Sequence, residues 1–446
     1  MDRGTIGAIR ITPLAFADPP LLNAAGVHEP HVLRALVEID VADGRGGTVT
    51  GLGECAGHAW QLDWLTLIAP RLLGTSVFDV HRLADRVDAC LTGADVDTAP
   101  DAAWRRWSDR SPEASLGIAP IPAPAFDRRR VHAPLEVACH DAAGRLLGVR
   151  VVDLLGGARR ESVEYAGYLF YKLAGHPDAD GAVTPDAWGE ALDAEGIVAQ
   201  AEALVAAHGF ASLKLKGGVF APEVEVATIH ALRRRFPAMP LRLDPNAAWS
   251  VPTAVAAAAQ LLGVVEYLED PVAGLEPMAE VARATGIPLA TNMCVVLTEH
   301  LAPALRLGSV SIVLGDHHYW GVLRGTLALD TACHALGFGL SMHSNSHLGV
   351  SLAAMTHVCA ASHVDHAADT HYPWNAADDI VAPGTLALVD GAVRLPDGPG
   401  LGVELDRAVV ERLHRAYLDL GREHRQDERY AEALGVTSVT GPLPRW

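Results

Sequence analysis

Residues 211–218, ASLKLKGG, hold a short apolar run that ends in charged residues and glycines, and this pattern decides the fold. Stretches with helical spacing, such as IVAQAEALVAAHGF at 197–210, separate it from other runs of the same type. Strand alternating with helix predicts parallel βαβ units. The similar runs occupy residues 163–170, 241–246, 264–270, 287–293, 310–316, 339–345 and 366–374.

The polar residues that end successive runs are almost evenly spaced. The steps from Asp244 through Glu269, Asn292 and Asp316 to His343 are 25, 23, 24 and 27 residues. A polar residue at each of several successive strand ends is typical of a (β/α) barrel with its active site at the C-terminal face. A doubly wound open sheet is the alternative, and it would gather ligand groups near one switch point. We predict an α/β fold with a (β/α)7β TIM-like barrel.

The flanking sequence predicts an α+β capping domain. Alternating stretches on either side of a Gly-rich turn at 43–47 indicate antiparallel pairing, and helical spacing follows at 61–90 and 134–147. After about residue 385 the chain returns to turns and one helix, at 409–421. The expected division is a capping domain over 1–155, the barrel over 156–385, and a C-terminal segment over 386–446 that packs on the capping domain.

Composition excludes several classes of protein. The 446 residues include 54 acidic and 35 basic side chains, a net charge of −19, which repels nucleic acid and anionic membranes. No apolar run reaches the ~18–20 residues of a membrane helix. Six cysteines without a C-x-x-C pair indicate buried thiols in a reducing compartment. We expect a cytoplasmic homo-oligomer that acts on a small molecule and binds neither nucleic acid nor membrane.

Lysine usage points to chemistry at one strand. The chain has three lysines, Lys172, Lys214 and Lys216, and the last two are placed to share one face of a strand. Two adjacent cations lower each other's pKa, which would make a general base that arginine cannot supply. A solvated strand face is the alternative reading of this pattern. Lys172 has no predicted function.

Asp244, Glu269 and Asn292 offer three oxygen ligands on successive strand ends. Two carboxylates and an amide oxygen, completed by water and substrate, suit Mg²⁺. A single Asp is more often a helix cap, but three such residues in barrel register favour a metal site. Glu276 competes with Glu269, but it lies beyond the strand and is expected to cap the next helix.

Asp316 and His343 end the next two runs. A carboxylate beside an imidazole orients the ring and is expected to raise its pKa, which gives a general acid/base dyad. His317 and His318 are weaker candidates because Asp316 fits the register better. Mg²⁺ between a lysine and a His–Asp pair suits abstraction of a proton α to a carboxylate.

The sequence resembles the enolase superfamily and, within it, the glucarate dehydratase group. The resemblance implies that Asp244, Glu269 and Asn292 hold Mg²⁺. It implies that Lys216 and His343 are the acid/base catalysts, with Lys214 tuning Lys216 and Asp316 behind His343. Substrate contacts are implied for His28, Tyr168, Phe170, Asn246, Ser344, Asn345, His371 and Arg425. The matching motifs are GVHEP (26–30), GYLFY (167–171), LKLKGGV (213–219), LDPNAAWS (243–250), EDP (269–271), ATNM (290–293), GDHHYW (315–320), HSNSH (343–347) and DTHYPW (369–374).

Three departures from the family pattern lie in the capping region. Ala133 stands where a substrate-binding threonine is expected just before a helix. The loop after Glu54 reads CAGHAWQLD (55–63) in place of the family's Gly-rich form, and the 92–127 segment is long and unlike the family. The resemblance implies that this region sets specificity.

The expected activity is that of a Mg²⁺-dependent acid-sugar dehydratase, with D-glucarate as the first substrate and a keto-deoxy diacid as product. The alternatives are dehydration of galactarate or another acid sugar, an acid-sugar epimerase or racemase, and a non-catalytic relative that only binds acid sugars.

Overall fold

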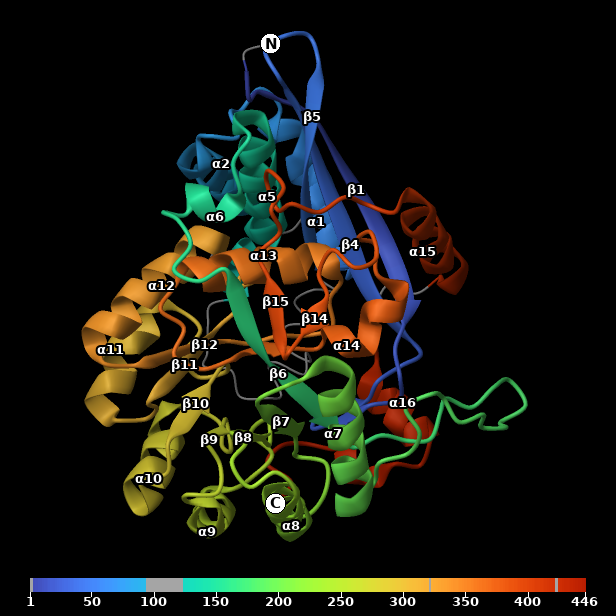
Figure 1. Ribbon diagram of the computed structural model, residues 1–446, viewed down its shortest axis with the longest axis vertical. Helices are drawn as coiled ribbons and strands as arrows, with labels where there is room; N and C mark the ends of the chain where they lie inside the picture. Colours follow the sequence, from blue (N-terminus) through green and yellow to red (C-terminus); the bar gives the residue numbers. More distant parts are fainter. Residues whose placement is uncertain (1–2, 94–122, 321, 422–423) are drawn as a thin grey trace.

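The computed structural model describes residues 3–93, 123–320, 322–421 and 424–446. Figure 1 shows a barrel in the lower part of the molecule and an antiparallel sheet with helices above it. Most of the 92–127 segment lies outside the described residues, so its predicted divergence has no structural outcome.

Eight strands close into the barrel. β6 pairs in parallel with β7 on one side and with β13 on the other, and the ladder is continuous from β7 to β12. Between β12 and β13, Leu340 N donates to Asp365 Oδ2 at 2.9 Å and Ser341 Oγ donates to Ala367 O at 2.9 Å. This closure confirms the barrel and excludes the open sheet. The strands are β6 (Ser162–Phe170), β7 (Leu213–Lys216), β8 (Leu241–Asp244), β9 (Tyr267–Glu269), β10 (Leu289–Thr291), β11 (Ile312–Gly315), β12 (Gly339–Met342) and β13 (Ala368–Thr370).

Seven helices link the strands, and local sequence sets their ends. Before α7, the Asp193 carboxylate caps the helix by accepting from Gly196 N at 2.8 Å, and Gly209 ends it with φ 71°. Ser250 caps α9 in the same way, with a proline in the first turn. The helices are α7 (Ala194–His208), α8 (Pro222–Arg235), α9 (Val251–Leu261), α10 (Leu275–Thr285), α11 (Thr298–Leu307), α12 (Val322–Leu336) and α13 (Gly349–Ala361).

The capping region is built on an antiparallel sheet in the order β1–β4–β5. The predicted Gly-rich turn joins β4 to β5, and the Asp43 carboxylate holds it by accepting from Arg45 N at 2.7 Å and Gly47 N at 2.9 Å. Helices cover one face of the sheet (Figure 1). The elements are β1 (Ile6–Ala17), β2 (Leu22–Asn23), β3 (Gly26–Val27), β4 (His31–Ala42), β5 (Thr48–Ala56), α1 (Ala59–Leu72), α2 (Val80–Gly93), α5 (Ala123–Leu147) and α6 (Val151–Leu154).

Helix α5 begins eleven residues before the expected start, at Ala123 instead of residue 134. Pro134 lies inside α5, although proline is favoured in a first turn and disrupts a helix interior. Inside α5 it leaves Arg130 O without its helical donor, and Gln61 Nε2 donates to that oxygen instead, at 2.8 Å. Ala133 is therefore a buried residue within the helix, not before it.

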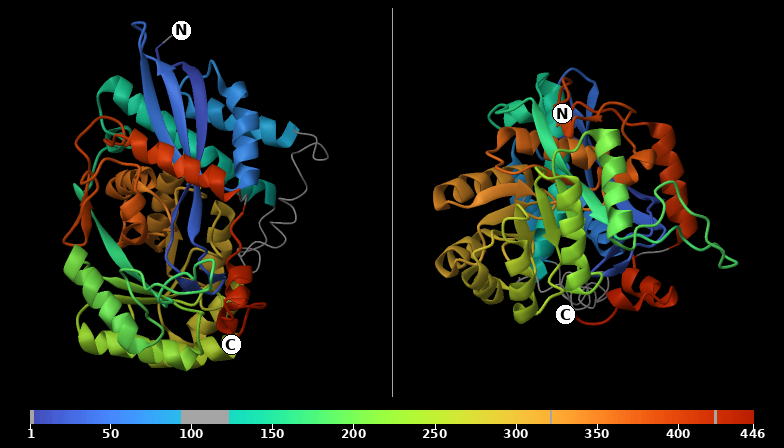
Figure 2. Two further views of the ribbon diagram at one scale, coloured as in Figure 1. Left: turned by 90° about the vertical axis from the view of Figure 1, so that its right-hand side faces the viewer. Right: turned by 60° about the horizontal axis from the view of Figure 1, so that its bottom comes forward.

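The C-terminal residues contact both parts of the molecule. α15 packs against β1 and α16 against β3, whereas β15 pairs with the barrel strand β6. Figure 2 shows α15 lying along the capping sheet. The boundaries at 155 and 385 stay predictions. The elements are α14 (Tyr372–Asn375), a 3-10 turn (Ala376–Asp378), β14 (Leu388–Val389), β15 (Ala392–Arg394), α15 (Arg407–Leu420), α16 (Asp427–Ala433) and a second 3-10 turn (Thr437–Val439).

Among the described residues, no helix has both the length and the apolar character needed to cross a bilayer. The cytoplasmic location and the homo-oligomeric state stay predictions.

Close approach of α5 to β5 depends on glycine. A Cβ added at Gly53 would lie 2.0 Å from Pro134 O. We expect Gly53→Ala to lower the free energy of unfolding by about 1–3 kcal/mol, the usual range for overpacking. Urea denaturation measures the change. Gly398→Ala is the control, because its Cβ meets nothing closer than 3.2 Å. Equal effects at the two positions would contradict the close packing.

Candidate active site

The predicted catalytic and metal-ligating residues all lie at the carboxyl ends of barrel strands. Asp244 and Glu269 end β8 and β9, and Lys216 ends β7 two residues beyond Lys214. Because parallel strands of a barrel end at one face, side chains far apart in sequence converge there. The residues that directly follow β10, β11 and β12 are Asn292, Asp316 and His343.

The two lysines lie against the two carboxylates. Lys216 Nζ is 2.5 Å from Asp244 Oδ2, and Lys214 Nζ is 2.5 Å from Glu269 Oε2 and 3.3 Å from Asp244 Oδ2. Lys214, Asp244 and Glu269 are fully buried. The strand register thus brings four charges together that the sequence separates by up to 55 residues.

The oxygen atoms of this cluster fit a divalent cation. Oε1 of Glu269 and Oδ1 of Asn292 are buried and accept no hydrogen bond from the described residues, whereas Oε2 of Glu269 is ion-paired with Lys214. Burial, together with the charge of Asp244, raises the pKa of Glu269 well above its usual value. A hard cation would satisfy these oxygens and favour the ionised form of Glu269.

The structure corrects the expected pKa of Lys214. Burial lowers this pKa, but the charges of Asp369, Glu269 and Asp244 outweigh burial and hold it well above the usual value. The expectation of a lowered pKa counted only the neighbouring lysine and missed these acids. Lys214 is therefore a fixed cation within the cluster.

Asp369 is a site residue that the sequence reasoning missed. Its Oδ2 lies 2.8 Å from Lys214 Nζ and accepts from Tyr168 OH at 2.9 Å, while Oδ1 accepts from Arg242 NH1 at 3.0 Å. Arg242 also bonds Glu266 at 2.7 Å. The sequence did contain a signal for its partner Arg242. Arg242 stands two residues before Asp244 and therefore shares its face of the strand, as Lys214 does with Lys216.

The predicted His–Asp dyad forms, with His343 Nδ1 3.0 Å from Asp316 Oδ2. The expected rise in the pKa of His343 is wrong. Burial lowers the pKa of His343, and the positive charges of Lys216 and Lys214 lower it further. The hydrogen bond and the charge of Asp316 raise this pKa, but by less. Asp316 itself stays ionised, because the histidines beside it lower its pKa in spite of burial.

His318 is closer to the dyad than expected. Its Nδ1 lies 2.8 Å from Asp316 Oδ1, so two histidines share one carboxylate. The GDHHYW motif contained this signal, because the second residue after Asp316 can turn back onto its side chain. His317 stacks on His318 with ring centroids 4.0 Å apart.

A cavity of about 350 Å³ lies over these strand ends. Lys214, Asp244, Glu269 and Asp316 do not line it. Lys214, Asp244 and Asp316 contact residues that do, and Glu269 lies against Lys214. The other predicted site residues all line it, namely His28, Tyr168, Phe170, Lys216, Asn246, Asn292, His343, Ser344, Asn345, His371 and Arg425. Sequence reasoning missed polar lining residues from the capping region, namely Asn23, Arg34, His58, Gln61 and Arg130.

The Asp18 carboxylate links predicted substrate-binding residues that come from three parts of the chain. Its Oδ2 lies 2.8 Å from His28 Nδ1 and 2.9 Å from Arg425 NH2, and Asn375 Nδ2 donates to Oδ1 at 3.4 Å. Asn375 in turn bonds His371 Nδ1 at 2.8 Å. The C-terminal segment therefore reaches the cavity through Arg425.

Of the three capping departures, the CAGHAWQLD loop lines the cavity through Cys55, Ala56, His58 and Gln61, whereas Ala133 does not line it. Arg130, three residues earlier in α5, does so. The position that faces the cavity from this helix is therefore Arg130.

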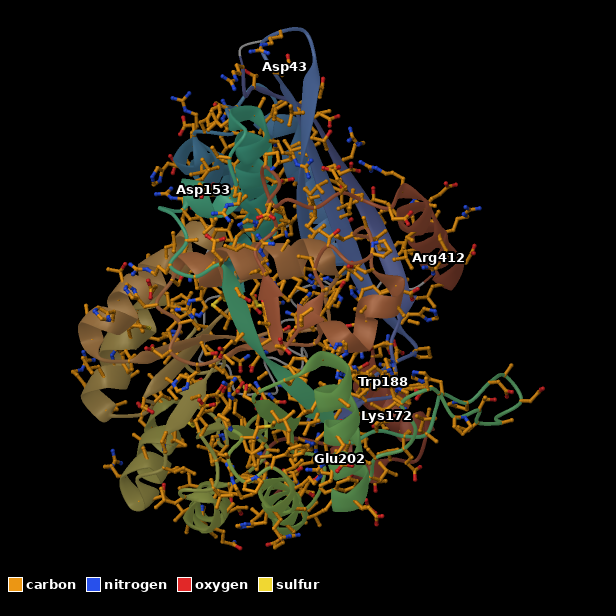
Figure 3. The ribbon with its side chains drawn as sticks, in the orientation of Figure 1. Asp43, Asp153, Lys172, Trp188, Glu202 and Arg412 are labelled. Atoms are coloured by element: carbon orange, nitrogen blue, oxygen red, sulfur yellow. The ribbon has the colours of Figure 1, made fainter. Side chains whose placement is uncertain are left out.

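Lys172 has a structural explanation. Its Nζ donates to the carbonyl oxygens of Leu173 at 2.7 Å and Gly189 at 2.8 Å, and pairs with Asp186 at 2.7 Å. Figure 3 shows Lys172 and Trp188 at the base of the projecting loop between β6 and α7. Lys172 therefore holds the start of this loop, at Leu173, against its later residues Asp186 and Gly189.

Comparison with known proteins gives four further findings. Residues 196–409 match the family described as Enolase C-terminal domain-like. A protein named probable glucarate dehydratase, from Streptomyces coelicolor, is 47% identical over 451 residues that cover 99% of each chain. A solved enolase from Thermobispora bispora, complexed with magnesium and formate, is 47% identical, with a TM-score of 0.90 over 99% of this chain and 100% of that chain. A solved enolase from Mycobacterium smegmatis, complexed with tartrate, is also 47% identical, with a TM-score of 0.88 over 99% of this chain and 98% of that one.

Asp369→Asn should destabilise the protein, because Lys214 and Arg242 would lose a shared buried partner. We expect a loss of about 3 kcal/mol in the free energy of unfolding, as for a broken buried ion pair. Urea denaturation compares it with Asp397→Asn, which removes an exposed pair with Arg394 and should cost less than about 1 kcal/mol. An unchanged stability of Asp369→Asn would contradict the role given to this carboxylate.

Proposed function

Since the chain belongs to the enolase superfamily, we propose that it is a Mg²⁺-dependent dehydratase of acid sugars, with D-glucarate as the first candidate substrate. The observation that carries the proposal is the cavity wall, which holds two proton-transfer groups, Lys216 and His343, above a buried cluster of acidic ligands. The relative named probable glucarate dehydratase supports the same activity.

Asp244, Glu269 and Asn292 would hold the metal ion. The unsatisfied oxygens of Glu269 and Asn292 support this assignment, as does the magnesium in the Thermobispora bispora enolase. When bound, Mg²⁺ would stabilise the negative charge that develops on the substrate carboxylate as the α proton leaves.

Lys216 and His343 would exchange protons with the substrate. The Nδ1 of His343 is hydrogen-bonded to the ionised Asp316, so Nε2 is the ring nitrogen left to exchange a proton with the substrate. Its lowered pKa keeps the ring neutral at neutral pH and able to accept a proton. Which of the two groups removes the α proton depends on the configuration of that carbon, since they belong to strands on different sides of the barrel mouth.

The chemistry then balances without a further reactant. The α C–H bond breaks and its proton passes to the base, after which the β C–O bond breaks. When His343 has removed the α proton, the same proton passes from its Nε2 to the departing hydroxyl, which leaves as water. When Lys216 is the base, His343 first takes up a proton from solvent and gives that proton to the hydroxyl, and Lys216 returns its proton to solvent. The resulting enol tautomerises to a keto-deoxy diacid.

Residues of the cavity wall would recognise the rest of the sugar. Tyr168, Asn246, Ser344 and Asn345 offer polar groups there. His28, Phe170 and His371 supply a face of packed rings, with the Phe170 and His371 centroids 5.2 Å apart. Arg425 pairs with Asp18 and Asp427, so its charge is already balanced before a distal carboxylate arrives.

A screen of acid sugars tests the proposal. The protein with Mg²⁺ is incubated with D-glucarate, galactarate, other aldarates and monoacid sugars, and products are read by mass spectrometry and a ketone reagent. We expect loss of one water and a new ketone from an aldarate. A new stereoisomer of unchanged mass would indicate an epimerase. Absence of product from every aldarate, with Mg²⁺ bound, would overturn the assignment.

Replacement of His343 tests its role. His343→Asn should reduce dehydration by at least about 100-fold, the lower range for a general acid–base group, and calorimetry should show unchanged Mg²⁺ binding. His81→Asn, at an exposed histidine of α2, is the matched control and should keep full activity. Full turnover by His343→Asn would show that the dyad is wrongly assigned.

A further inference from the structure

The Asp316 carboxylate divides its two oxygens between two histidines. Oδ2 faces His343 Nδ1 at 3.0 Å. Oδ1 faces His318 Nδ1 at 2.8 Å and accepts from His318 backbone N at 2.8 Å. The proposed catalytic step uses only His343, so the role of the second histidine is open.

The hydrogen bonds of His318 fix where its proton lies. Arg34 NH2 is 3.1 Å from His318 Nε2. A guanidinium has only donors, so Nε2 must accept this bond and carries no proton. Ser351 Oγ, 2.9 Å from Nε2, can also donate to it. His318 is then a neutral ring that donates from Nδ1 to Asp316.

Arg34 is held firmly in this position. Its Nε donates to Glu54 Oε1 at 2.9 Å, and the two side chains are 4% and 0% exposed, respectively. Glu54 also accepts from Leu348 N at 2.9 Å and Ser351 N at 2.8 Å, where α13 begins. Arg34 and Glu54 lie on β4 and β5, so the chain of contacts runs from the capping sheet to the barrel dyad.

We propose that Arg34 and His318 are positioning residues for His343. Arg34 keeps His318 neutral, and neutral His318 holds Asp316 in place without cancelling its charge. Asp316 then retains a full negative charge to stabilise the protonated form of His343. This inference rests on the proposed dehydration, in which His343 passes through that form.

The surroundings of His318 explain why Arg34 is needed. Asp316 faces Nδ1 of His318, Arg34 faces its Nε2, and the His317 ring packs on it with centroids 4.0 Å apart. Of these groups, only Arg34 occupies Nε2 with a permanent positive charge. Without Arg34, His318 could take up a second proton. The charged ring would then form an ion pair with Asp316, and Asp316 would stabilise the charge of His343 less.

Side-chain NMR tests the protonation state without any substrate. In the full-length protein with ¹⁵N-labelled histidine, His318 should be a neutral ring protonated at Nδ1 near pH 7. A charged ring, or a neutral ring protonated at Nε2, would overturn the inference. Because no turnover is needed, this outcome is separate from failure of the proposed function.

Variants of His318 test its effect on the reaction. His318→Phe removes the side-chain donor to Asp316, leaves the backbone donor in place, and should lower the dehydration kcat by about 10-fold, a part of what general acid–base groups contribute, with little change in KM. His318→Asn places an uncharged N–H donor near the position of Nδ1 and should restore most of the rate. Equal kcat for His318→Phe and the unmodified protein would contradict the role.

Arg34 is tested together with Glu54, so that no buried charge loses its partner. Arg34→Met with Glu54→Gln should lower kcat by about 10-fold, and adding His318→Asn should recover it, because asparagine cannot become charged. Lack of recovery would contradict the inference. Exchange of the α proton by Lys216, followed in D₂O with an aldarate epimer that presents that proton to Lys216, should stay within about twofold of the unmodified protein. A parallel loss of exchange would mean that the variant damages the whole site.

Discussion

Buried charge at the carboxyl end of the barrel is the constraint on which the rest of the site depends. Lys214 lies within 3.3 Å of oxygens from Asp244, Glu269 and Asp369, and all four side chains are fully buried. Removing ions from water costs several kcal/mol each unless they are paired. The barrel supplies the pairs by ending β7, β8, β9 and β13 at the same face. Lys216 and Arg242 also pair with Asp244 and Asp369, yet Glu269 Oε1 and Asn292 Oδ1 accept no hydrogen bond from the described residues, which is why the cluster suits a divalent ion.

Side chains of the barrel, the capping region and the C-terminal segment together form the cavity wall. The barrel provides the acids, the lysines and His343, whereas the capping region contributes Arg34 to the wall of the cavity. The C-terminal segment supplies Arg425, which Asp18 ties to the capping side. The cavity wall thus draws side chains from different parts of the chain, which the Arg425–Asp18 ion pair helps to join.

Periodicity made most of the barrel predictable. The near-equal spacing from Asp244 to His343 placed five polar residues at strand ends, and the structure puts each at the end of a strand or directly after it. The start of α5 was not predictable, because the carbonyl freed by Pro134 is satisfied by Gln61, a distant residue. The pKa directions of Lys214 and His343 failed for a similar reason. They depend on burial and on charges brought near by folding, which local sequence does not contain.

The claim that this cluster is a metal site can be tested directly by anomalous diffraction from crystals soaked in Mn²⁺, which takes the oxygen ligands of Mg²⁺. The account predicts one strong peak bounded by Asp244, Glu269 and Asn292, with Lys214 displaced from Glu269. It would be contradicted by density without a peak there and with Lys214 still against Glu269, because the acids would then be fully balanced by lysine.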